Sequence, residues 1–231
     1  MTKFPYKHII WDWNGTLLDD SWLSVSVINE VLSKREMPTI SHEHYTSIFG
    51  FPVIDYYKRL GFDFIDESFE IIGTEFIDGY EAKKFELALH KDTKRVLNEL
   101  KNRGVSHSIL SAYKQSFFEE LIDHFDLGEM FIKVIGLDNH YAHSKVENGV
   151  QWMKELPFER SEVLFVGDTS HDFEVADAIG VDCVLIPGGH QTREVLAKTG
   201  AIIFDDIRKI MLLPQSLKGT KQYQEYSSDS S

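Results

Sequence analysis

The chain has 231 residues, of which 42% are hydrophobic and 13% aromatic, enough to build the core of one large domain or of two unequal ones. Its 24 basic and 37 acidic side chains give a formal charge of -13 at pH 7, which disfavours nucleic acid and anionic membrane surfaces as partners. No apolar run approaches the ~20 residues that span a bilayer, and the N-terminus lacks a basic region followed by an apolar one, so we expect a cytoplasmic protein.

Six short apolar runs, most of them separated by helical patterns, are typical of buried strands. They lie at residues 8 to 11, 105 to 110, 131 to 136, 163 to 166, 181 to 186 and 201 to 204. Alternation of this kind predicts an α/β fold in which helices cover a parallel sheet.

The first predicted strand leads into the segment WDWNGTLLDD, at residues 11 to 20. Because side chains alternate across a strand, Asp12 and Asn14 are expected on one side of it. Trp11 and Trp13 are then expected on the other side. An amide forms hydrogen bonds but cannot move a proton. This face therefore carries one carboxylate and lacks a second one that could act as its general acid and base.

The spacing between the first two strands is too long for a simple crossover, because residues 18 to 90 contain several helical segments and no convincing strand. We therefore predict an all-helical cap domain at 18–87, inserted into an α/β core formed by 1–17 and 88–214. Two helical faces are assigned to the core of this bundle: Trp22, Val25, Ile28 and Leu32, and Phe69, Ile72, Phe76 and Tyr80.

The segment FGFP, at residues 49 to 52, lies between these two faces. It is a Gly/Pro turn flanked by aromatic residues, with Pro52 near the start of a further helix. We predict that this loop faces a substrate. The segment 49–53 is expected to select that substrate together with side chains near it in the chain: His42, His44, Lys58 and Arg59.

Two helices are well marked in the second half of the chain. Residues 117–125 carry an apolar stripe and are followed by Gly128. A second helix is predicted from Thr169 to Ile179 and is closed by Gly180.

Four further sites are assigned no catalytic role. The single cysteine, Cys183, lies in an apolar run and is expected to be a buried structural thiol. His143 and His171 lack a matching cluster of ligands, so neither is predicted to bind metal. The polar, Ser-rich segment 215–231 predicts a disordered tail.

Polar residues follow the predicted strands: Asp12 the first, Ser111 the second, Lys145 the third, and the segment GDTSHD at 167–172 the fourth. In an open α/β sheet, ligands bind outside the carboxyl ends of the strands, so these residues are expected to converge. Asp12, Asp168 and Asp172 would crowd three carboxylates together, which requires a cation, and an all-oxygen site suits Mg²⁺ best. Lys145 and the Ser111 hydroxyl would then bind a phosphate.

With these motifs, the chain from about Tyr6 to Leu213 resembles the haloacid dehalogenase superfamily, in particular its phosphatases of the phosphoglycolate-phosphatase-like type. The motifs are Asp-x-x-Gly-Thr after the first strand, Ser after the second, a Lys, and Gly-Asp-x-x-x-Asp after a further strand. In these proteins a helical cap is inserted just after the first motif. The resemblance implies a Rossmann-like core, Mg²⁺ as cofactor and a small phosphorylated substrate.

The resemblance also implies a role for each motif residue. Asp12 is the nucleophile that takes the phosphoryl group, and Thr16 shapes its loop. Ser111 and the backbone at Ala112 bind phosphate oxygens, and Lys145 balances the charge of the aspartyl phosphate. The implied Mg²⁺ ligands are Asp12, Asp168, Asp172 and the backbone carbonyl of Asn14.

The side chain of Asn14 departs from the family pattern. The phosphatases of the family usually have an aspartic acid here, which protonates the leaving oxygen and later deprotonates water. Loss of such a group typically lowers the rate by ~10²–10⁴-fold. Four accounts are open: a substrate whose leaving group needs no proton, such as an acyl or aryl phosphate; a substitute donor from the cap or solvent; a protein that mainly binds its ligand; or an engineered substitution.

The sequence therefore predicts a Mg²⁺-dependent phosphohydrolase that removes phosphate from a small phosphorylated metabolite through an aspartyl phosphate. One alternative is a carbon-phosphorus bond hydrolase, which would need a cap lysine such as Lys58 to form an imine. Another is a receiver-like or scaffold domain that binds a phosphorylated ligand with little turnover. The sequence leaves the oligomeric state open.

Overall fold

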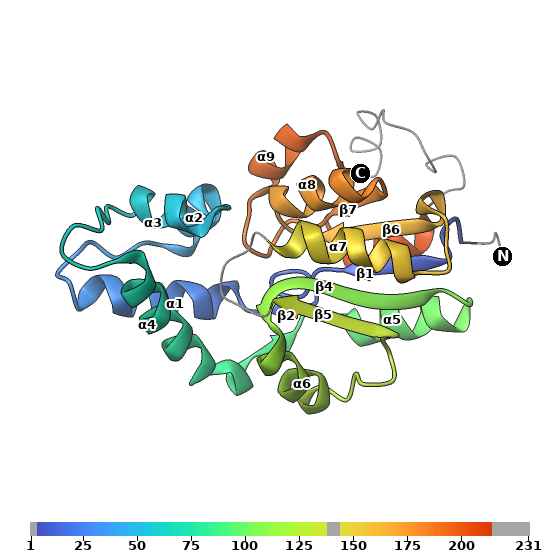
Figure 1. Ribbon diagram of the computed structural model, residues 1–231, viewed down its shortest axis with the longest axis horizontal. Helices are drawn as coiled ribbons and strands as arrows, with labels where there is room; N and C mark the ends of the chain where they lie inside the picture. The colour runs from blue at the N-terminus through green and yellow to red at the C-terminus, as the bar shows by residue number, and fades with distance from the viewer. Residues whose placement is uncertain (1–3, 138–143, 214–231) are drawn as a thin grey trace.

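The computed structural model describes residues 4–137 and 144–213, so the predictions for His143 and for the tail 215–231 lie outside the described residues. Its centre is a parallel six-stranded sheet with the strand order β5-β4-β1-β6-β7-β8 (Figure 1). The strands are β1 (His8–Trp11), β4 (Ser106–Lys114), β5 (Lys133–Leu137), β6 (Val163–Gly167), β7 (Asp182–Leu185) and β8 (Ile202–Ile203). Each strand contains residues of one predicted apolar run, so the α/β fold with a Rossmann-like parallel sheet is confirmed.

Helices cover both faces of the sheet (Figure 1): α5 (Thr93–Asn102) and α6 (Gln115–His124) on one face, and α7 (Ser144–Glu155) and α8 (Ser170–Ile179) on the other. The remaining elements after the first half of the chain are α9 (Arg193–Leu196) and the 3-10 turns η2 (Arg160–Glu162), η3 (Ala197–Thr199) and η4 (Ile207–Leu212). Both helices predicted in the second half of the chain, α6 and α8, are therefore present.

The side chains of β1 divide between the two faces of the sheet. Ile10 is buried in a cluster with residues of α7 and α8, whereas Ile9 and Trp11 are buried with residues of α5 and α6. Trp13 belongs to the same cluster as Trp11, which confirms the predicted alternation. Asp12, which has the parity of Ile10, therefore follows the strand on the side of α7 and α8.

The sequence at both ends of α8 explains its limits. The Thr169 hydroxyl accepts the backbone N–H of Asp172, and the Asp172 carboxylate accepts the backbone N–H of Thr169, which is a capping box. At the other end Gly180 has a φ of +75°, the left-handed conformation that ends many helices. This cap holds Asp172 at the carboxyl end of β6.

Four helices between β1 and β4 pack together at one end of the molecule (left in Figure 1): α1 (Ser21–Ser33), α2 (His42–Ile48), α3 (Val53–Arg59) and α4 (Phe69–Glu81). In α1, Ile28 and Leu32 pack with the other helices of this group, whereas Leu23 and Val27 join the main core. The prediction that Trp22 is a core residue is wrong, because this side chain is 43% exposed and its indole N–H donates to the Asp19 carbonyl.

The base of this helical group contains two short strands and the 3-10 turn η1 (Lys84–Glu86), whereas the sequence predicted no strand between residues 18 and 90. β2 (Leu18–Asp19) pairs antiparallel with β3 (Ala88–Leu89). Strands of two residues are too short to show an alternating pattern, which is why the sequence does not reveal them. This pairing joins the segment that leaves the sheet for the helical group to the segment that returns from it.

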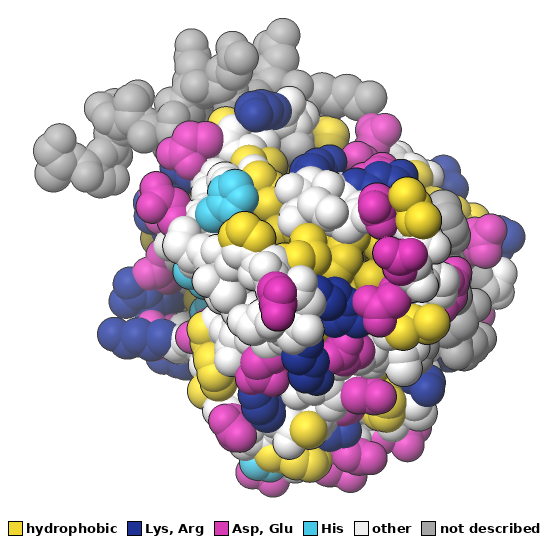
Figure 2. Space-filling model, turned by 90° about the vertical axis from the view of Figure 1, so that its left-hand side faces the viewer, with side chains coloured by type: hydrophobic (Ala, Val, Ile, Leu, Met, Phe, Trp, Pro, Cys, Tyr) yellow, Lys and Arg dark blue, Asp and Glu magenta, His cyan; other side chains and the backbone are white. Residues whose placement is uncertain are grey.

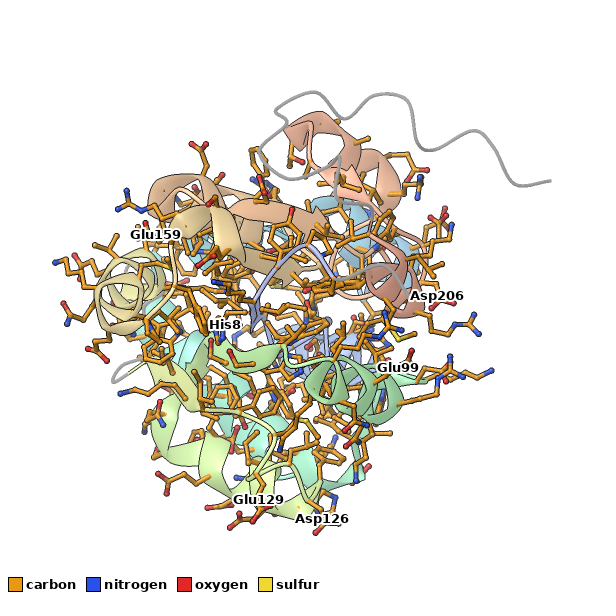
Figure 3. The ribbon with its side chains drawn as sticks, turned by 90° about the vertical axis from the view of Figure 1, so that its right-hand side faces the viewer. His8, Glu99, Asp126, Glu129, Glu159 and Asp206 are labelled. Carbon is orange, nitrogen blue, oxygen red and sulfur yellow. The ribbon has the colours of Figure 1, made fainter. Side chains whose placement is uncertain are left out.

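At the end of the sheet opposite the helical group, the buried polar side chain of His8 belongs to the core. Figure 3 shows His8 inside this end and five acidic residues around its periphery: Glu99, Asp126, Glu129, Glu159 and Asp206. The two ring nitrogens of His8 lie 2.7 and 2.8 Å from the hydroxyls of Ser106 and Ser108. Burial lowers the pKa of His8 to about 3, so it is a neutral, hydrogen-bonded core residue.

One further feature agrees with the sequence predictions. Cys183 is buried in β7, and burial raises the pKa of its thiol, as expected for a structural cysteine. Across residues 4–137 and 144–213, the structure contains no helix with the length and apolar character of a membrane span.

Candidate active site

Three buried, charged side chains meet where β1 ends. Asp12 directly follows β1, Lys145 lies in the first turn of α7, and Asp172 lies in the first turn of α8. The Lys145 ammonium donates to Asp12 Oδ1 and to Asp172 Oδ1, both at 2.6 Å. The strand order changes direction at β1, which is where open α/β sheets bind their ligands.

The carboxylates of Asp12, Asp168 and Asp172 form a buried cluster. One oxygen of each can be chosen so that all three lie within 4.8 Å of one another. Burial, together with the two neighbouring carboxylates and against the pull of Lys145, raises the pKa of Asp12 to about 8. Burial also raises the pKa of Asp168 to about 6. Three carboxylates crowded in this way favour a bound cation.

Lys145 is a fixed positive charge beside Asp12. Burial opposes the charged form of Lys145, but Asp12 and Asp172 outweigh it and hold the pKa of the ammonium above its ordinary value. Burial also opposes ionisation of Asp172, yet Lys145 holds the pKa of that carboxyl below its ordinary value. The pair stays ionised across the physiological pH range.

Ser111 and Ala112 line the same cavity as Asp12. They lie within β4, which continues to Lys114, so the prediction that this strand ends at residue 110 is wrong. The pairing of β4 with β5 shifts between Leu110 and Lys114, which interrupts the pattern at this point. Ser111 Oγ accepts the backbone N–H of Tyr113 at 3.1 Å, and no described residue accepts its hydroxyl hydrogen.

The loop after Asp12 is packed tightly against Asp168. Thr16 Oγ1 donates to Asp168 Oδ1 at 2.9 Å and lies 3.4 Å from Asp12 Oδ2. Gly15 has a φ of +74°, and a Cβ added there would lie 2.3 Å from Asp168 Oδ2 and 2.7 Å from the ring of His190. Both the backbone conformation and the lack of space therefore require glycine at this position.

We expect Gly15→Ala to lower the free energy of unfolding by roughly 3 kcal/mol or more, because the methyl group must displace the Asp168 carboxylate. Gly104→Ala is the matched control, because Gly104 has a φ of +81° with nothing within 4 Å of the added Cβ. It isolates the cost of placing a Cβ on left-handed backbone, roughly 1–2 kcal/mol. Urea unfolding of both variants measures the difference, and equal losses would show that the close approach at Gly15 is unimportant.

The side-chain amide of Asn14 is held by two neighbours. Its Nδ2 donates to Asp20 Oδ2 at 2.9 Å and to the Tyr80 hydroxyl at 3.0 Å, while that hydroxyl donates to Asp20 Oδ2 at 2.8 Å. Both amide hydrogens of Asn14 are thereby used within the protein. The side-chain oxygen can accept a hydrogen bond, but this group has no proton to give to a leaving oxygen.

Two residues that the sequence did not reveal, Asp20 and His190, also line the cavity. His190 Nε2 lies 3.2 Å from Asp20 Oδ1, and its Nδ1 lies 2.8 Å from the Tyr45 hydroxyl. Burial opposes the charged form of His190, but Asp20 outweighs it and raises the pKa of His190 to about 9. His190 follows the end of β7, so the strand-end rule that identifies Asp12 was a usable signal for it. The sequence offers no comparable signal for Asp20.

A cavity of about 260 Å³ lies between the helical group and the carboxyl end of the sheet. The segment 49–53 contributes Phe49, Phe51 and Val53 to its wall. Figure 2, which looks onto this end of the molecule, shows hydrophobic side chains grouped near the centre of the face among charged ones. Six residues predicted for the site line the cavity: Asp12, Asn14, Ser111, Ala112, Lys145 and Asp172.

Other sequence candidates lie away from the cavity. None of the four side chains predicted to select the substrate together with the loop is among its lining residues: His42, His44, Lys58 and Arg59. Lys58 is exposed and pairs with Asp55, so the structure does not bring the lysine of the carbon-phosphorus alternative to the site. His171 lies outside the carboxylate cluster and contacts Phe51 and Glu174.

Comparison with known proteins places this arrangement in a family. Over 218 residues the chain is 27% identical to a phosphoglycolate phosphatase of Pseudomonas syringae pv. tomato, covering 90% of this chain and 79% of that protein. Over 211 residues it is 24% identical to the tyrosine-protein kinase PtkA of Mycobacterium bovis, covering 90% and 72%. A crystal structure described as a predicted phosphatase from Clostridium acetobutylicum superimposes with a TM-score of 0.75 at 19% identity, covering 90% and 99%. Residues 9–186 match the family described as haloacid dehalogenase-like hydrolase, and the chain belongs to that family.

Proposed function

We propose that this chain is a phosphohydrolase that removes phosphate from a small phosphorylated molecule by way of a phosphoryl group held on Asp12. The observation that carries the proposal is the double contact of Lys145 with Asp12 and Asp172 at the end of β1. Phosphoryl transfer depends chiefly on positioning and on electrostatic stabilisation of the phosphate oxygens. A buried cation beside a carboxylate, at the edge of a cavity, supports that chemistry.

The proposed reaction has two steps. A carboxylate oxygen of Asp12 attacks the phosphorus, the bond between phosphorus and the leaving oxygen breaks, and the leaving group keeps the electron pair. Water then attacks the phosphorus of the aspartyl phosphate, which releases inorganic phosphate and restores the Asp12 carboxylate. Lys145 stays charged throughout, while the Ser111 hydroxyl and the backbone N–H of Ala112 donate to phosphate oxygens.

Mg²⁺ is the cation that we propose for the carboxylate cluster. Asp12, Asp168 and Asp172 offer only oxygen donors, which suits a hard divalent cation, and the raised pKa values of Asp12 and Asp168 reflect first their burial and then the neighbouring carboxylates. The backbone carbonyl of Asn14 is proposed as a further ligand. When bound, the ion would stabilise the negative charge of the transferring phosphoryl group.

We expect Asp168→Asn to weaken Mg²⁺ binding roughly tenfold or more, because the change removes one charged ligand. Isothermal titration with MgCl₂ measures this without reference to activity. A second measurement is the rise in melting temperature with Mg²⁺, which should be present in the unchanged protein and small in the variant. Glu129→Gln, an exposed site at the opposite end of the molecule (Figure 3), is the charge-matched control. Equal Mg²⁺ affinities in the two variants would contradict the site.

The cap and the identity of the substrate are part of the proposal. We infer that the segment 18–87 acts as a cap over the sheet edge, because its helices supply much of the cavity wall. The names of the relatives differ in what they act on, since one is a phosphoglycolate phosphatase and another a tyrosine-protein kinase. We therefore assign neither substrate to this chain.

Release of inorganic phosphate from p-nitrophenyl phosphate, with Mg²⁺ and with excess EDTA, tests the proposed function most simply. Phosphate release that requires Mg²⁺ is the expected result. A protein that binds phosphate compounds without releasing phosphate would instead be the binding domain considered above. Full activity in excess EDTA would contradict the proposed role of Mg²⁺.

A further inference from the structure

The cavity beside Asp12 is walled by aromatic rings. Six of them come from the loop before α3, from α3 itself, from α4 and from α6: Phe49, Phe51, Tyr56, Phe76, Tyr80 and Phe117. A cavity of about 150 Å³ lined by apolar side chains is enough to bind benzene. The 260 Å³ here are therefore large enough for a substituted aromatic ring. Aromatic walls attract such a ring through burial of apolar surface and edge-to-face contacts.

A glycine enlarges the cavity on the side of α4. The residues of α4 that face the cavity recur at helical spacing, and Gly73 lies in the middle of that face, between Glu70 and Ile77. A Cβ added at Gly73 would have nothing within 4 Å. Glycine inside a helix costs about 1 kcal/mol relative to alanine. The missing side chain leaves open space where the apolar part of a ligand would lie.

Most of the cationic side chains that line the cavity, among the described residues, are already paired with carboxylates. Among the described residues that line it, the cationic side chains are Lys114, Lys145 and His190. Lys145 is held between two carboxylates, His190 is paired with Asp20, and the Lys114 ammonium lies over the ring of Phe117 at 4.9 Å. Two glutamates of α4 also line the cavity and would repel a carboxylate. Among these cations, the carboxylate of a small phosphorylated acid would therefore have only Lys114 as a partner, and it would lie near the carboxylate of Glu70.

The side chain of Asn14 also limits which leaving group the site can accept. Both of its amide hydrogens are bound by Asp20 and Tyr80, and an amide has no proton to transfer. An alkoxide needs a proton as its bond to phosphorus breaks. A phenolate leaves without one, because the pKa of a phenol is only about 10.

We propose that the substrate is the phosphate monoester of a phenol, a proposal that rests on the phosphohydrolase function above. The ring lies among the aromatic side chains, and the ester oxygen faces Asn14. Asp12 displaces phenolate, and water then displaces the carboxylate from phosphorus. One proton of that water stays on the released hydrogen phosphate and the other goes to the phenolate, so the products are a phenol and hydrogen phosphate.

A set of four substrates tests the class: phenyl phosphate, benzyl phosphate, acetyl phosphate and phosphoglycolate. Phenyl and benzyl phosphate share the ring but differ in the acidity of the leaving group, so kcat/KM for phenyl phosphate should be higher by ~10²-fold or more. Acetyl phosphate leaves without a proton but lacks the ring, so its KM should be higher than that of phenyl phosphate by roughly tenfold. Phosphoglycolate should be hydrolysed least of the four.

The variant Gly73→Leu tests the cavity itself, because its side chain starts from a Cβ with nothing within 4 Å and extends into the open space. We expect KM for 2-naphthyl phosphate to rise by roughly tenfold more than KM for acetyl phosphate, which has no ring to exclude. Asp78→Leu is the matched control, because it places the same side chain on the exposed side of the same helix, away from the cavity. Circular dichroism checks that both variants are folded.

The outcomes separate the two proposals. If none of the four phosphates is hydrolysed, the phosphohydrolase function itself fails. If phosphate is released but benzyl phosphate or phosphoglycolate reacts as fast as phenyl phosphate, the function stands and the aryl class is wrong. A preference for acetyl phosphate over phenyl phosphate, or an equal effect of Gly73→Leu on both kinds of substrate, would also overturn the aryl class.

Discussion

Asp12→Asn is expected to lower kcat by about 10⁴-fold or more, because an amide cannot replace a carboxylate as the group that attacks phosphorus. The change keeps the shape of the side chain. It also removes one ionisable group from a cluster in which burial and neighbouring carboxylates raise the pKa of Asp12. The fold should therefore survive, with Lys145 still paired with Asp172.

The measurement is steady-state phosphate release from phenyl phosphate, with a thermal melt of the same sample to show that the variant is folded. Glu129→Gln serves again as a control for loss of one negative charge, and it should retain normal turnover. If Asp12→Asn keeps more than about a tenth of the original kcat, Asp12 is not the nucleophile and the proposed reaction must be abandoned.

Asn14→Asp is expected to raise kcat for benzyl phosphate by ~10²-fold relative to phenyl phosphate, because it supplies the acid that an alkoxide leaving group needs. The structure gives a physical reason why the new carboxyl group would hold a proton. It would replace an amide that donates to Asp20 Oδ2 at 2.9 Å, so two carboxyl groups would face each other. Like charges at this distance raise one of the two pKa values, which keeps an acid protonated near neutral pH.

Two neighbours limit the cost of that substitution. His190 stays paired with Asp20 and stabilises its ionised form, and the Tyr80 hydroxyl remains a donor to the carboxyl pair. The measurement is kcat for both substrates in both proteins, with burst kinetics to show that chemistry limits the rate. An equal change for the two substrates, or no change, would mean that Asn14 does not occupy the position of the proton donor.

The inner strands were predictable because each combines a short apolar run with burial on both faces. Ile9 and Ile10 are fully buried on opposite faces of β1, and the runs around Val166 and Val184 behave in the same way. The positions of Asp12 and Asp172 followed from the rule that ligands bind beyond the carboxyl ends of parallel strands. These local patterns carry most of the fold.

The parts that the sequence did not reveal depend on contacts between distant segments. The continuation of β4 past Ser111 requires an irregular pairing with β5, and the pairing of β2 with β3 joins two short segments with no pattern of their own. In the sequence, nothing distinguishes Asp20 from other acidic residues. Its role follows only from the structure, in which Asn14, Tyr80 and His190 surround it. The aromatic side chains of α4 were predicted to be core residues of the helical group, but Phe69, Phe76 and Tyr80 also line the cavity, which only their placement around the open space reveals.

Detection of a phosphoryl group on Asp12 tests the central claim most directly. The protein is mixed with excess phenyl phosphate and Mg²⁺, quenched in acid within a turnover, digested and analysed by mass spectrometry. The account predicts a peptide that contains Asp12 and has gained the mass of one phosphoryl group. The modification should be lost on treatment with hydroxylamine, as expected for an acyl phosphate, and should be missing from Asp12→Asn. Phosphate release during turnover with no labelled Asp12, or with the phosphoryl group on another residue, would contradict it.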